Sequence, residues 1–484
     1  MSNLIVVDKP KNWPLEISGV KVVPAREYLT NPLYSELRGV KVFNLCRSYR
    51  YQSNGYYVSL LAEARGHKPL PNVATILDLK SQTVIRIASD ELDDIIQKSL
   101  KTIQSDKFVL SIYFGRNVAR KYKRLALHLF NLFQAPLLRA YFVYKEKWEL
   151  QNIETIDAGE IPDEHRPFVV EVASEYFGGR RISLPKRENW KYDLAILYNP
   201  DEPEAPSDEK AIEKFVKAAE ALALSVELIT KDDFGRLAEY DALFIRETTN
   251  VNHHTYRFSQ RATAEGLFVI DDPESILKCA NKVYLAELLT RYKVPIPKTM
   301  MVHKDNLEIV SSQLGFPMIL KQPDSAFSQG VLKVKSNEEF LHEANRFLEK
   351  SELLIAQEFM PTQFDWRIGI INNEAIYAFK DYMGSGHWQI INNERKRYAR
   401  YGKAETIPIE LAPKQVVRTA LKAANLIGDG LYGVDVKEID SKCYVVEVND
   451  NPSIDAGVED AILKDKLYAI IMNVFLQKLE LSKR

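Results

Sequence analysis

Residues 432–436 read YGVDV, and residues 444–452 read YVVEVNDNP after a short turn. Both stretches are apolar and rich in valine, which predicts two strands that pair through the turn as a hairpin. Side chains alternate between the faces of a strand, so Glu447 and Asn449 are expected on one face. The hairpin pairing is expected to bring Asp435 to the same face. Two carboxylates and an amide oxygen on one surface are typical of a Mg²⁺ site.

The alternative is that Asp435 and Glu447 line a solvated face of the sheet. Their strands are otherwise almost entirely apolar. An unpaired buried carboxylate is costly, and buried charges usually pair or bind a metal. The pattern therefore favours a metal site over a solvated surface.

A lysine stands at the end of an earlier predicted strand, residues 316–321, and a loop of small and polar residues follows at 322–331. The ammonium of Lys321 is a compact charge for phosphate oxygens, and small residues let backbone N–H groups approach them. The loop does not match the Walker pattern, and taken alone it indicates an ordinary turn more strongly than a phosphate-binding loop.

The chain has 484 residues, which is enough for about three α/β domains. Residues 1–185 are predicted to form a mixed α/β domain. Residues 191–278 alternate short apolar runs with helical periodicity, which predicts a small open α/β sheet with parallel strands. Residues 279–484 carry the motifs above. No internal repeat is apparent.

The composition excludes several classes of protein. A formal net charge of -1 provides no global field that would attract nucleic acid or anionic lipid. No apolar run approaches the roughly 20 residues of a membrane span, and the N-terminus lacks the pattern of a secretory signal. The three cysteines, Cys46, Cys279 and Cys443, are far apart in sequence, which fits a reducing compartment. We expect a cytoplasmic protein without nucleic acid or membrane partners.

Together and in this order, the motifs resemble the ATP-grasp superfamily. Within it they are most similar to the RimK-like branch, named for the ribosomal protein S6 glutamate ligase. The resemblance covers about residues 191–459, if the open α/β segment is counted as the usual pre-ATP-grasp domain. It implies that residues 279–484 form an α+β ATP-grasp module of two subdomains.

The resemblance implies an ATP site. Lys282 and Lys321 would hold the ATP phosphates, and a loop containing Ser325, Ser328 and Gly330 would close over them. The adenine hinge and the position near the ribose would be formed by Glu358, Phe359, Met360 and Asp365.

The resemblance also implies a metal site and two catalytic positions. Asp435, Glu447 and Asn449 would hold Mg²⁺ against the triphosphate, and Mn²⁺ can substitute for it. Arg367 and Lys380 match basic positions that face the phosphates or an acyl phosphate.

The sequence departs from the branch at residues 382–390, YMGSGHWQI, where the S6-modifying branch has an arginine- and asparagine-containing stretch. Specificity for glutamate and for that ribosomal protein is therefore not carried over. His387 and Trp388 are candidates for a substrate site, together with Asn451. The alternative is that Trp388 is a core residue and His387 caps a turn.

Residues 47–79 resemble an N-terminal domain that is fused to RimK-like ATP-grasp modules. That resemblance names an architecture and no chemistry. One polar and aromatic group of residues there has two interpretations: Arg47, Tyr49, Arg50, Tyr51, Gln52 and Asn54. In the first interpretation they form a carboxylate-binding surface, because arginine pairs with carboxylates bidentately. In the second they pack the domain against the ligase half, because arginine and tyrosine are also favoured at interfaces. We favour packing.

The expected reaction is ATP-dependent ligation of a carboxylate to an amine through an acyl phosphate, with glutamate as one possible substrate. The amine is expected on an amino acid, a peptide or a protein terminus, and the enzyme is expected to be a homo-oligomer. Two alternatives are a small-molecule peptide ligase of the glutathione-synthetase kind and a non-catalytic nucleotide-binding regulator.

Overall fold

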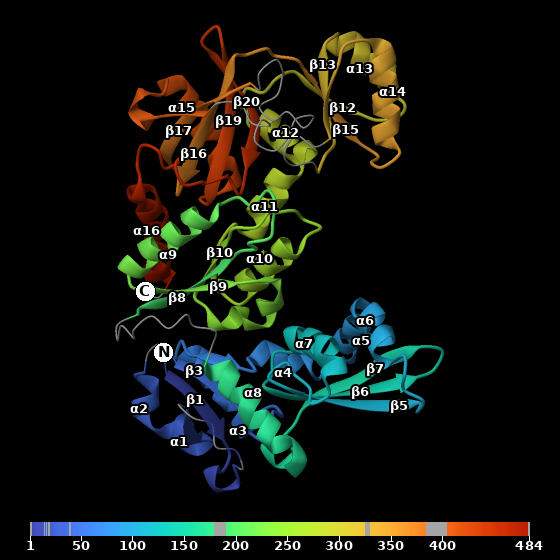
Figure 1. Ribbon diagram of the computed structural model, residues 1–484, viewed down its shortest axis with the longest axis vertical. Coiled ribbons are helices and arrows are strands. Elements are labelled where there is room, and N and C mark those ends of the chain that lie inside the picture. Colours follow the sequence, from blue (N-terminus) through green and yellow to red (C-terminus); the bar gives the residue numbers. More distant parts are fainter. Residues whose placement is uncertain are drawn as a thin grey trace. The chain divides into compact units, whose positions relative to one another are not determined.

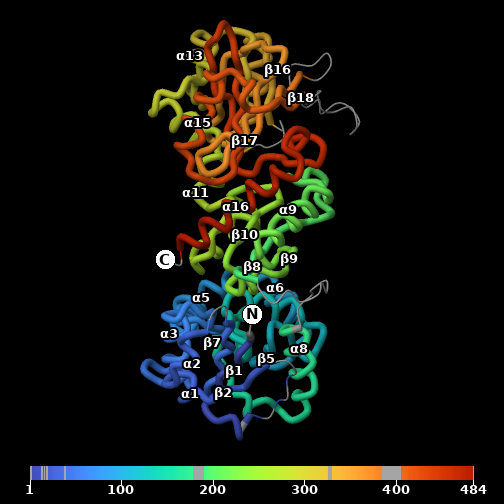
Figure 2. Tube along the Cα trace, turned by 90° about the vertical axis from the view of Figure 1, so that its left-hand side faces the viewer, coloured from blue at the N-terminus to red at the C-terminus, as the bar shows by residue number. Residues whose placement is uncertain are grey.

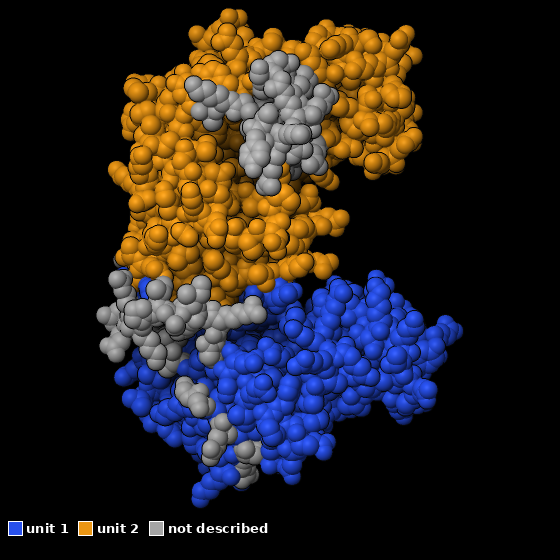
Figure 3. Space-filling model, in the orientation of Figure 1, with its two compact units in different colours: residues 1–191, 232–239 blue, residues 192–231, 240–484 orange. Residues whose placement is uncertain are grey.

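The computed structural model describes residues 2–482 except 14, 16, 18–19, 38–39, 179–189, 325–329 and 384–403 (Figure 1). The chain divides into two compact units, which Figure 3 shows in different colours. Unit 1 is Met1–Lys191 with Asp232–Glu239, and unit 2 is Tyr192–Lys231 with Tyr240–Arg484. None of the described helices combines the length and the apolar character that a membrane span requires.

Unit 1 begins with a parallel sheet in the order β2-β1-β3-β4. Figure 2 labels its strands β1 and β2. Its strands are β1 (Ser2–Val7), β2 (Lys21–Pro24), β3 (Val40–Asn44) and β4 (Lys68–Leu70). The helices that accompany them are α1 (Ala25–Thr30), α2 (Pro32–Ser35), α3 (Asn54–Ala64) and α4 (Val73–Asp78). Alternate residues of the strands, such as Leu4 and Val6, pack with Tyr28 in one buried cluster, as the period of two requires.

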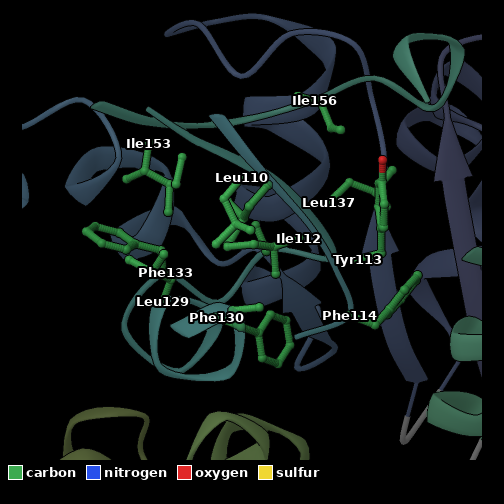
Figure 4. Close-up of a cluster of buried hydrophobic side chains, with 14 of the residues drawn as sticks. Leu110, Ile112, Tyr113, Phe114, Leu129, Phe130, Phe133, Leu137, Ile153 and Ile156 are labelled. Atoms are coloured by element: carbon green, nitrogen blue, oxygen red, sulfur yellow. The ribbon is translucent and has the colours of Figure 1, made fainter. Parts of the chain in front are cut away.

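The rest of unit 1 is an antiparallel sheet in the order β5-β6-β7. Its strands are β5 (Lys107–Tyr113), β6 (Leu137–Tyr144) and β7 (Trp148–Thr155). The helices are α5 (Gln82–Glu91), α6 (Asp93–Leu100), α7 (Lys123–Leu132) and α8 (Arg166–Gly178). Side chains from the strands and from α7, such as Ile112, Leu129 and Ile153, form a buried cluster (Figure 4). Each such side chain contributes about 1.5–3 kcal/mol when fully buried.

Unit 2 also begins with a parallel sheet, in the order β11-β10-β8-β9, which confirms the predicted open α/β sheet. Its strands are β8 (Tyr192–Leu197), β9 (Leu224–Ile229), β10 (Ala242–Ile245) and β11 (Phe268–Ile270). Its helices are α9 (Glu209–Ala221), α10 (His254–Ala264) and α11 (Pro273–Ala280). The final helix, α16 (Asp465–Ser482), packs against α9, where the ring centroids of Phe215 and Tyr468 are 4.7 Å apart (Figure 1).

Two antiparallel sheets complete unit 2. One has the order β12-β15-β13-β14 and consists of β12 (Thr299–Val302), β13 (Met318–Lys321), β14 (Val331–Val334) and β15 (Leu354–Glu358), with α13 (Leu307–Leu314) and α14 (Asn337–Leu348). The other has the order β18-β17-β16-β19-β20 and consists of β16 (Phe364–Ile371), β17 (Glu374–Tyr382), β18 (Ala404–Ile407), β19 (Leu431–Ile439) and β20 (Lys442–Asn449), with α15 (Lys414–Ile427). The helix α12 (Lys282–Arg291) precedes both.

The structure contains an internal repeat, so the expectation of none was wrong. The parallel sheets of the two units have the same strand order when β1 to β4 are matched with β8 to β11 in sequence order. The registers also match. Val42 pairs with Leu4 and with Pro69 in unit 1, and Leu243 pairs with Ala195 and with Val269 in unit 2.

The second half of the repeat has a constant spacing. Helix α3 recurs as α10, 200 residues later, and α4 and α5 recur as α11 and α12. The pairs of identical residues are Tyr56 and Tyr256, Ser59 and Ser259, Ala62 and Ala262, Ala64 and Ala264, Gly66 and Gly266, Ile76 and Ile276, and Leu77 and Leu277. We call residues 2–91 copy 1 and residues 192–291 copy 2.

Buried and turn residues maintain the common framework. The Oγ of Ser59 donates to the carbonyl oxygen of Pro71 at 2.6 Å, and the Oγ of Ser259 donates to that of Asp271, also at 2.6 Å. The helix that contains each serine is followed by a glycine with positive φ, 70° at Gly66 and 78° at Gly266. Glycine adopts this conformation without a steric penalty.

Candidate active site

A large cavity lies within unit 2. Its volume is about 1190 Å³, and it is lined by residues from all three sheets of the unit. Tyr198 and Thr248 come from the carboxyl ends of the parallel strands, Gln357 from β15, and Arg367 and Glu447 from the five-stranded sheet. This volume exceeds that of a typical small-molecule site, so the cavity has room for more than one ligand.

Lys282 is the first residue of α12 and lines the cavity. The side chain of Asn281 caps this helix by accepting from the backbone N–H groups of Val283 and Tyr284. The backbone N–H of Lys282 donates to the carbonyl oxygen of Pro323 at 2.9 Å. The start of α12 is therefore fastened to the loop that follows β13, and the Nζ of Lys282 lies 3.0 Å from an oxygen of Glu447.

Lys321 is the last residue of β13 and is also buried in the cavity wall. Burial lowers the pKa of Lys321 to about 8, and the charges of Lys282 and Lys437 act in the same direction. Burial destabilises the charged form of an ammonium, and a nearby anion restores it. Two lysines on one side of the cavity therefore form a site for a polyanion.

The strands β19 and β20 pair as the sequence predicted. Asp435 lies opposite Glu447, and Gly433 lies opposite Asn449. Burial raises the pKa of Asp435, although its bidentate ion pair with Arg367, at 2.6 and 2.8 Å, opposes the shift. Burial opposes ionisation of Glu447 as well, but Lys282 and Lys321 prevail and lower its pKa. Both carboxylates are thus held in place by cations.

The oxygen donors on this face fit a hard cation that arrives with its own ligands. The Nδ2 of Asn449 donates to the carbonyl oxygen of Gly433 at 3.4 Å, which directs the amide oxygen away from that strand. Within the described ranges, no three His, Cys, Asp or Glu side chains gather as a metal site. Mg²⁺ usually takes one or two protein carboxylates and completes its octahedron with phosphate and water. Asp435, Glu447 and Asn449 therefore suit Mg²⁺ bound together with a triphosphate.

Glu358, Phe359 and Met360 line the cavity at the end of β15. The backbone N–H of Glu358 donates to the carbonyl oxygen of Lys298 at 2.9 Å, and its carboxylate accepts from the backbone N–H of Lys298 at 2.7 Å. The Nζ of Lys333 lies 3.4 Å from the centroid of the Phe359 ring. The segment is therefore held rigidly beside an apolar part of the wall, which a flat aromatic base would fit.

Asp365 lines the cavity and is buried. Its Oδ1 accepts from the Nζ of Lys437 at 2.6 Å and from the Oγ1 of Thr362 at 2.7 Å. A ligand hydroxyl at this position would bind a carboxylate that is already oriented by two donors.

Two family models match most of the chain. Residues 279–468 match the RimK-like ATP-grasp domain, and residues 25–172 match the RimK-like ATPgrasp N-terminal domain. The chain belongs to the RimK-like ATP-grasp ligases. It is an ATP-dependent carboxylate–amine ligase.

Similar proteins include ligases from distant organisms. A probable alpha-L-glutamate ligase of Vibrio vulnificus is 26% identical over 233 residues, which are 47% of this chain and 74% of that protein. The alpha-aminoadipate–LysW ligase LysX of Saccharolobus solfataricus is 29% identical over 223 residues, 43% of this chain and 75% of that protein. Among solved structures, D-alanine–D-alanine ligase from Bacillus anthracis covers 59% of this chain and 96% of its own, at 14% identity and a TM-score of 0.46.

Lys380 does not face the ATP-grasp cavity, and the expectation that it does was wrong. Neighbouring residues of a strand point to opposite faces. Phe379 and Asp381 line the cavity, whereas the Nζ of Lys380 lies 5.2 Å from the centroid of the Phe364 ring and 3.9 Å from a carboxylate oxygen of Glu405. Arg367 does line the cavity, as expected.

The structure is silent on four of the expected residues. Ser325 and Ser328 of the phosphate loop, and His387 and Trp388, lie outside the described residues. Gly330, at the end of the loop, has a φ of 73°, and a Cβ there would lie 2.3 Å from the Oε1 of Gln322. No other residue fits that position without displacing the neighbour.

Asn451 lines the cavity but uses its side chain for the framework of the ATP-grasp site. Its Oδ1 accepts from the Nη1 of Arg246 at 2.7 Å, and its Nδ2 donates to the carbonyl oxygen of Glu247 at 2.6 Å. Arg246 is fully buried and also donates to Ser207 and to the carbonyl oxygen of Pro452. Sequence reasoning missed Arg246, although a single arginine directly after the apolar strand 242–245 was a signal.

Three carboxylates of the cavity wall were also missed by sequence reasoning, those of Glu202, Asp450 and Glu459. Burial raises the pKa of Asp450 and of Glu459 to about 7. The Oδ2 of Asp450 is buried without a hydrogen-bond partner among the described residues. Asp381 is a further missed carboxylate, and burial raises its pKa to about 6.

Proposed function

We propose that the unit 2 cavity activates a substrate carboxylate as an acyl phosphate and transfers the acyl group to an amine. One observation carries this proposal. The start of α12 and the end of β13 present Lys282 and Lys321 to the same cavity as the oxygen donors of β19 and β20. Cations for a triphosphate and ligands for its metal ion are the two requirements of phosphoryl transfer.

The residues around the cavity provide a place for each part of ATP. Glu358, Phe359 and Met360 would bind the adenine, and the carboxylate of Asp365 would accept from a ribose hydroxyl. Lys282 and Lys321 would hold phosphate oxygens. Asp435, Glu447 and Asn449 would hold Mg²⁺ or Mn²⁺, which would neutralise charge that develops on the transferred phosphoryl group.

The chemistry then needs two displacements. A carboxylate oxygen of the first substrate attacks the γ-phosphorus, and ADP leaves. The amine attacks the acyl carbon, and phosphate leaves with the carboxylate oxygen that it acquired. Arg367, which is already bound to Asp435, would stabilise negative charge on the acyl phosphate.

Three acidic side chains of the cavity wall suit the amine substrate. An ammonium group is attracted to Glu202, Asp450 and Glu459, and it must lose a proton before it attacks the acyl carbon. Two similar proteins are named as ligases of glutamate and of alpha-aminoadipate, which are acidic amino acids. We therefore place an acidic amino acid among the substrates. A cytoplasmic location and a homo-oligomeric state stay predictions.

The test is ADP formation with Mg²⁺-ATP across amino acids and short peptides, singly and in pairs. We expect ADP release that requires a carboxylate and an amine together. Lys321→Ala, Glu447→Gln and Asn449→Ala should each reduce it by about 100-fold or more, the usual scale for groups that stabilise transition-state charge.

Lys380→Ala is the matched control, because Lys380 lies on the same sheet but faces away from the cavity. It should retain wild-type turnover. Unimpaired turnover in all three cavity variants would contradict the proposed roles, and ATP binding without any substrate-dependent ADP release would contradict the ligase reaction.

A further inference from the structure

The internal repeat points to a second binding site, in unit 1. In copy 2, the carboxyl ends of β8 and β10 form part of the ligase cavity, through Tyr198 and Thr248. These strands are neighbours in the sheet. The chain continues from β8 to β9 at one edge of the sheet and from β10 to β11 at the other edge, so the strand order changes direction between β8 and β10, which defines a switch point. Ligands of open α/β sheets bind at such a switch point, as the cavity of unit 2 illustrates.

Copy 1 has the same switch point, between β1 and β3. The matching registers place Arg47 and Ser48 where copy 2 has the cavity-lining Thr248 and Thr249. Asp8 follows β1 and connects the two loops. Its Oδ2 accepts from the backbone N–H of Arg47 at 2.8 Å, and its Oδ1 accepts from the Nδ2 of Asn54 at 3.0 Å.

The loop that follows β3 has a fixed conformation. The hydroxyl of Tyr49 donates to the carbonyl oxygen of Asn44 at 2.5 Å, and the Nζ of Lys80 donates to the carbonyl oxygen of Tyr49 at 2.6 Å. The loop also approaches α3 so closely that a Cβ at Gly55 would lie 2.4 Å from the carbonyl oxygen of Ser48. A surface that is already ordered loses little entropy when a ligand binds.

The charge of this edge is opposite in the two copies. In copy 2, the loop after β8 carries only acidic charges, Asp201, Glu202, Glu204 and Asp208, and the loop after β10 adds Arg246 and Glu247, which are both buried. In copy 1, the exposed charges of the loops after β1 and β3 are mainly basic: Lys9, Lys11, Arg47 and Arg50. The two copies therefore have the same edge of the sheet, but its loops suit cations in copy 2 and anions in copy 1.

Three tyrosines extend the basic edge of copy 1, and two of them, Tyr51 and Tyr57, are exposed. The rings of Tyr51 and Tyr56 are 5.2 Å apart between centroids, and those of Tyr56 and Tyr57 are 5.7 Å apart. Tyr51 is 71% exposed. Tyrosine and arginine are the residues most enriched where proteins bind other proteins. The combination suits a peptide better than an isolated small anion.

Copy 1 does not retain the ATP site. Lys282 begins α12 in copy 2, and Gln82 occupies the equivalent first position of α5. The strands that follow copy 1 form the sheet β5-β6-β7, and this sheet has a different order from the sheet that carries Lys321. The edge of copy 1 is thus equipped for binding and not for phosphoryl transfer.

We propose that the edge formed by Arg47, Arg50 and Tyr51 docks an acidic peptide segment, in place of the packing role that the sequence favoured for these residues. Arginine pairs with carboxylates through two parallel hydrogen bonds, and the tyrosines supply the apolar contacts of a peptide interface. A ligase that holds one part of a peptide substrate here would raise the effective concentration of that substrate at its cavity.

The experiment uses the full chain and fluorescein-labelled hexaglutamate, followed by fluorescence anisotropy without ATP. Arg47→Glu combined with Arg50→Glu should weaken binding by about tenfold or more, which corresponds to about 1.4 kcal/mol. Tyr51→Ala is a second variant that leaves every charge in place and should also weaken binding.

The matched control is Arg120→Glu combined with Arg124→Glu. These two exposed arginines belong to another basic surface of unit 1, at the start of α7. Equal weakening in this control would show unspecific attraction and would overturn the proposal. So would loss of binding in Lys321→Ala, tighter binding of a uridine hexamer than of hexaglutamate, or no binding of hexaglutamate to the unmodified chain. None of these measurements requires ligase turnover, so a failure here is separate from a failure of the ligase assignment.

Discussion

Copy 1 and copy 2 share a framework but differ in chemistry. Both have four parallel strands in one order and one register, and both have the buried serine, the C-terminal glycine and the capped helices that follow. Only copy 2 is followed by the sheets that carry Lys321 and Glu447, and only its edge is acidic. The framework depends on a few buried and turn residues, whereas function depends on the loops at the carboxyl ends of the strands.

The largest expected difference between the copies is catalytic. Lys282→Ala removes a cation from the phosphate side of the cavity, so ADP formation should fall by about 100-fold or more. Gln82→Ala changes the equivalent residue of copy 1 and should leave the rate unchanged. Steady-state ADP release measures both. Equal effects of the two substitutions would contradict the assignment of the ATP site to copy 2 alone.

The second prediction concerns the framework. Ser59→Ala and Ser259→Ala each leave a buried carbonyl oxygen without its donor, which costs about 1–3 kcal/mol of unfolding free energy. Ser59 also accepts from the Nδ2 of Asn44 at 2.8 Å, so its loss should cost more. Hydrogen exchange followed by mass spectrometry should show faster exchange in α3 for one variant and in α10 for the other. Unchanged exchange in both helices would rule out the common structural role.

The third prediction separates the two sites by pH. Lys321 has a pKa lowered to about 8, so it is charged below that pH and neutral above it. The value of kcat/KM for ATP should therefore fall by about tenfold per pH unit above about pH 8. Arginine keeps its proton throughout this range, so hexaglutamate binding to copy 1 should not change. A flat ATP profile up to about pH 10 would show that Lys321 does not supply the charge.

The smallest expected effect tests the equivalence of the turns. A Cβ at Gly66 or Gly266 meets no atom within 4 Å, so alanine would cost only the positive φ. This cost is about 1 kcal/mol at each position, and the two variants should lower the melting temperature to a similar extent. Calorimetry of the full chain measures both. A much larger decrease in melting temperature at one position would show that the two turns differ in their contribution to stability.

The sequence predicted the local features that depend on periodicity. The alternation in residues 444–449 placed Glu447 and Asn449 on one face, and the short turn before them placed Asp435 opposite Glu447. The alternating helices and apolar runs predicted the parallel sheet of copy 2. These patterns are strong because one residue of slip would move every side chain to the other face.

The rest depended on pairing between distant segments. The register of β16 with β17 sets Arg367 opposite Phe379, which turns Lys380 away from the cavity, and no pattern within either strand fixes that register. Asp450 and Arg246 are brought to the site by long-range packing. The repeat escaped detection because its identities, such as Ser59 with Ser259, are few, and any βα unit shows a similar hydrophobic period.

The ligase reaction is tested most directly by the fate of one oxygen atom. The carboxylate substrate selected by the ADP assay would be labelled with ¹⁸O, and the products would be analysed by mass spectrometry. Transfer through an acyl phosphate moves one carboxylate oxygen into the released phosphate, so labelled inorganic phosphate is the predicted result. Label in AMP would show activation by adenylation, and unlabelled phosphate would show that water is the acceptor. Either outcome would contradict the proposed mechanism.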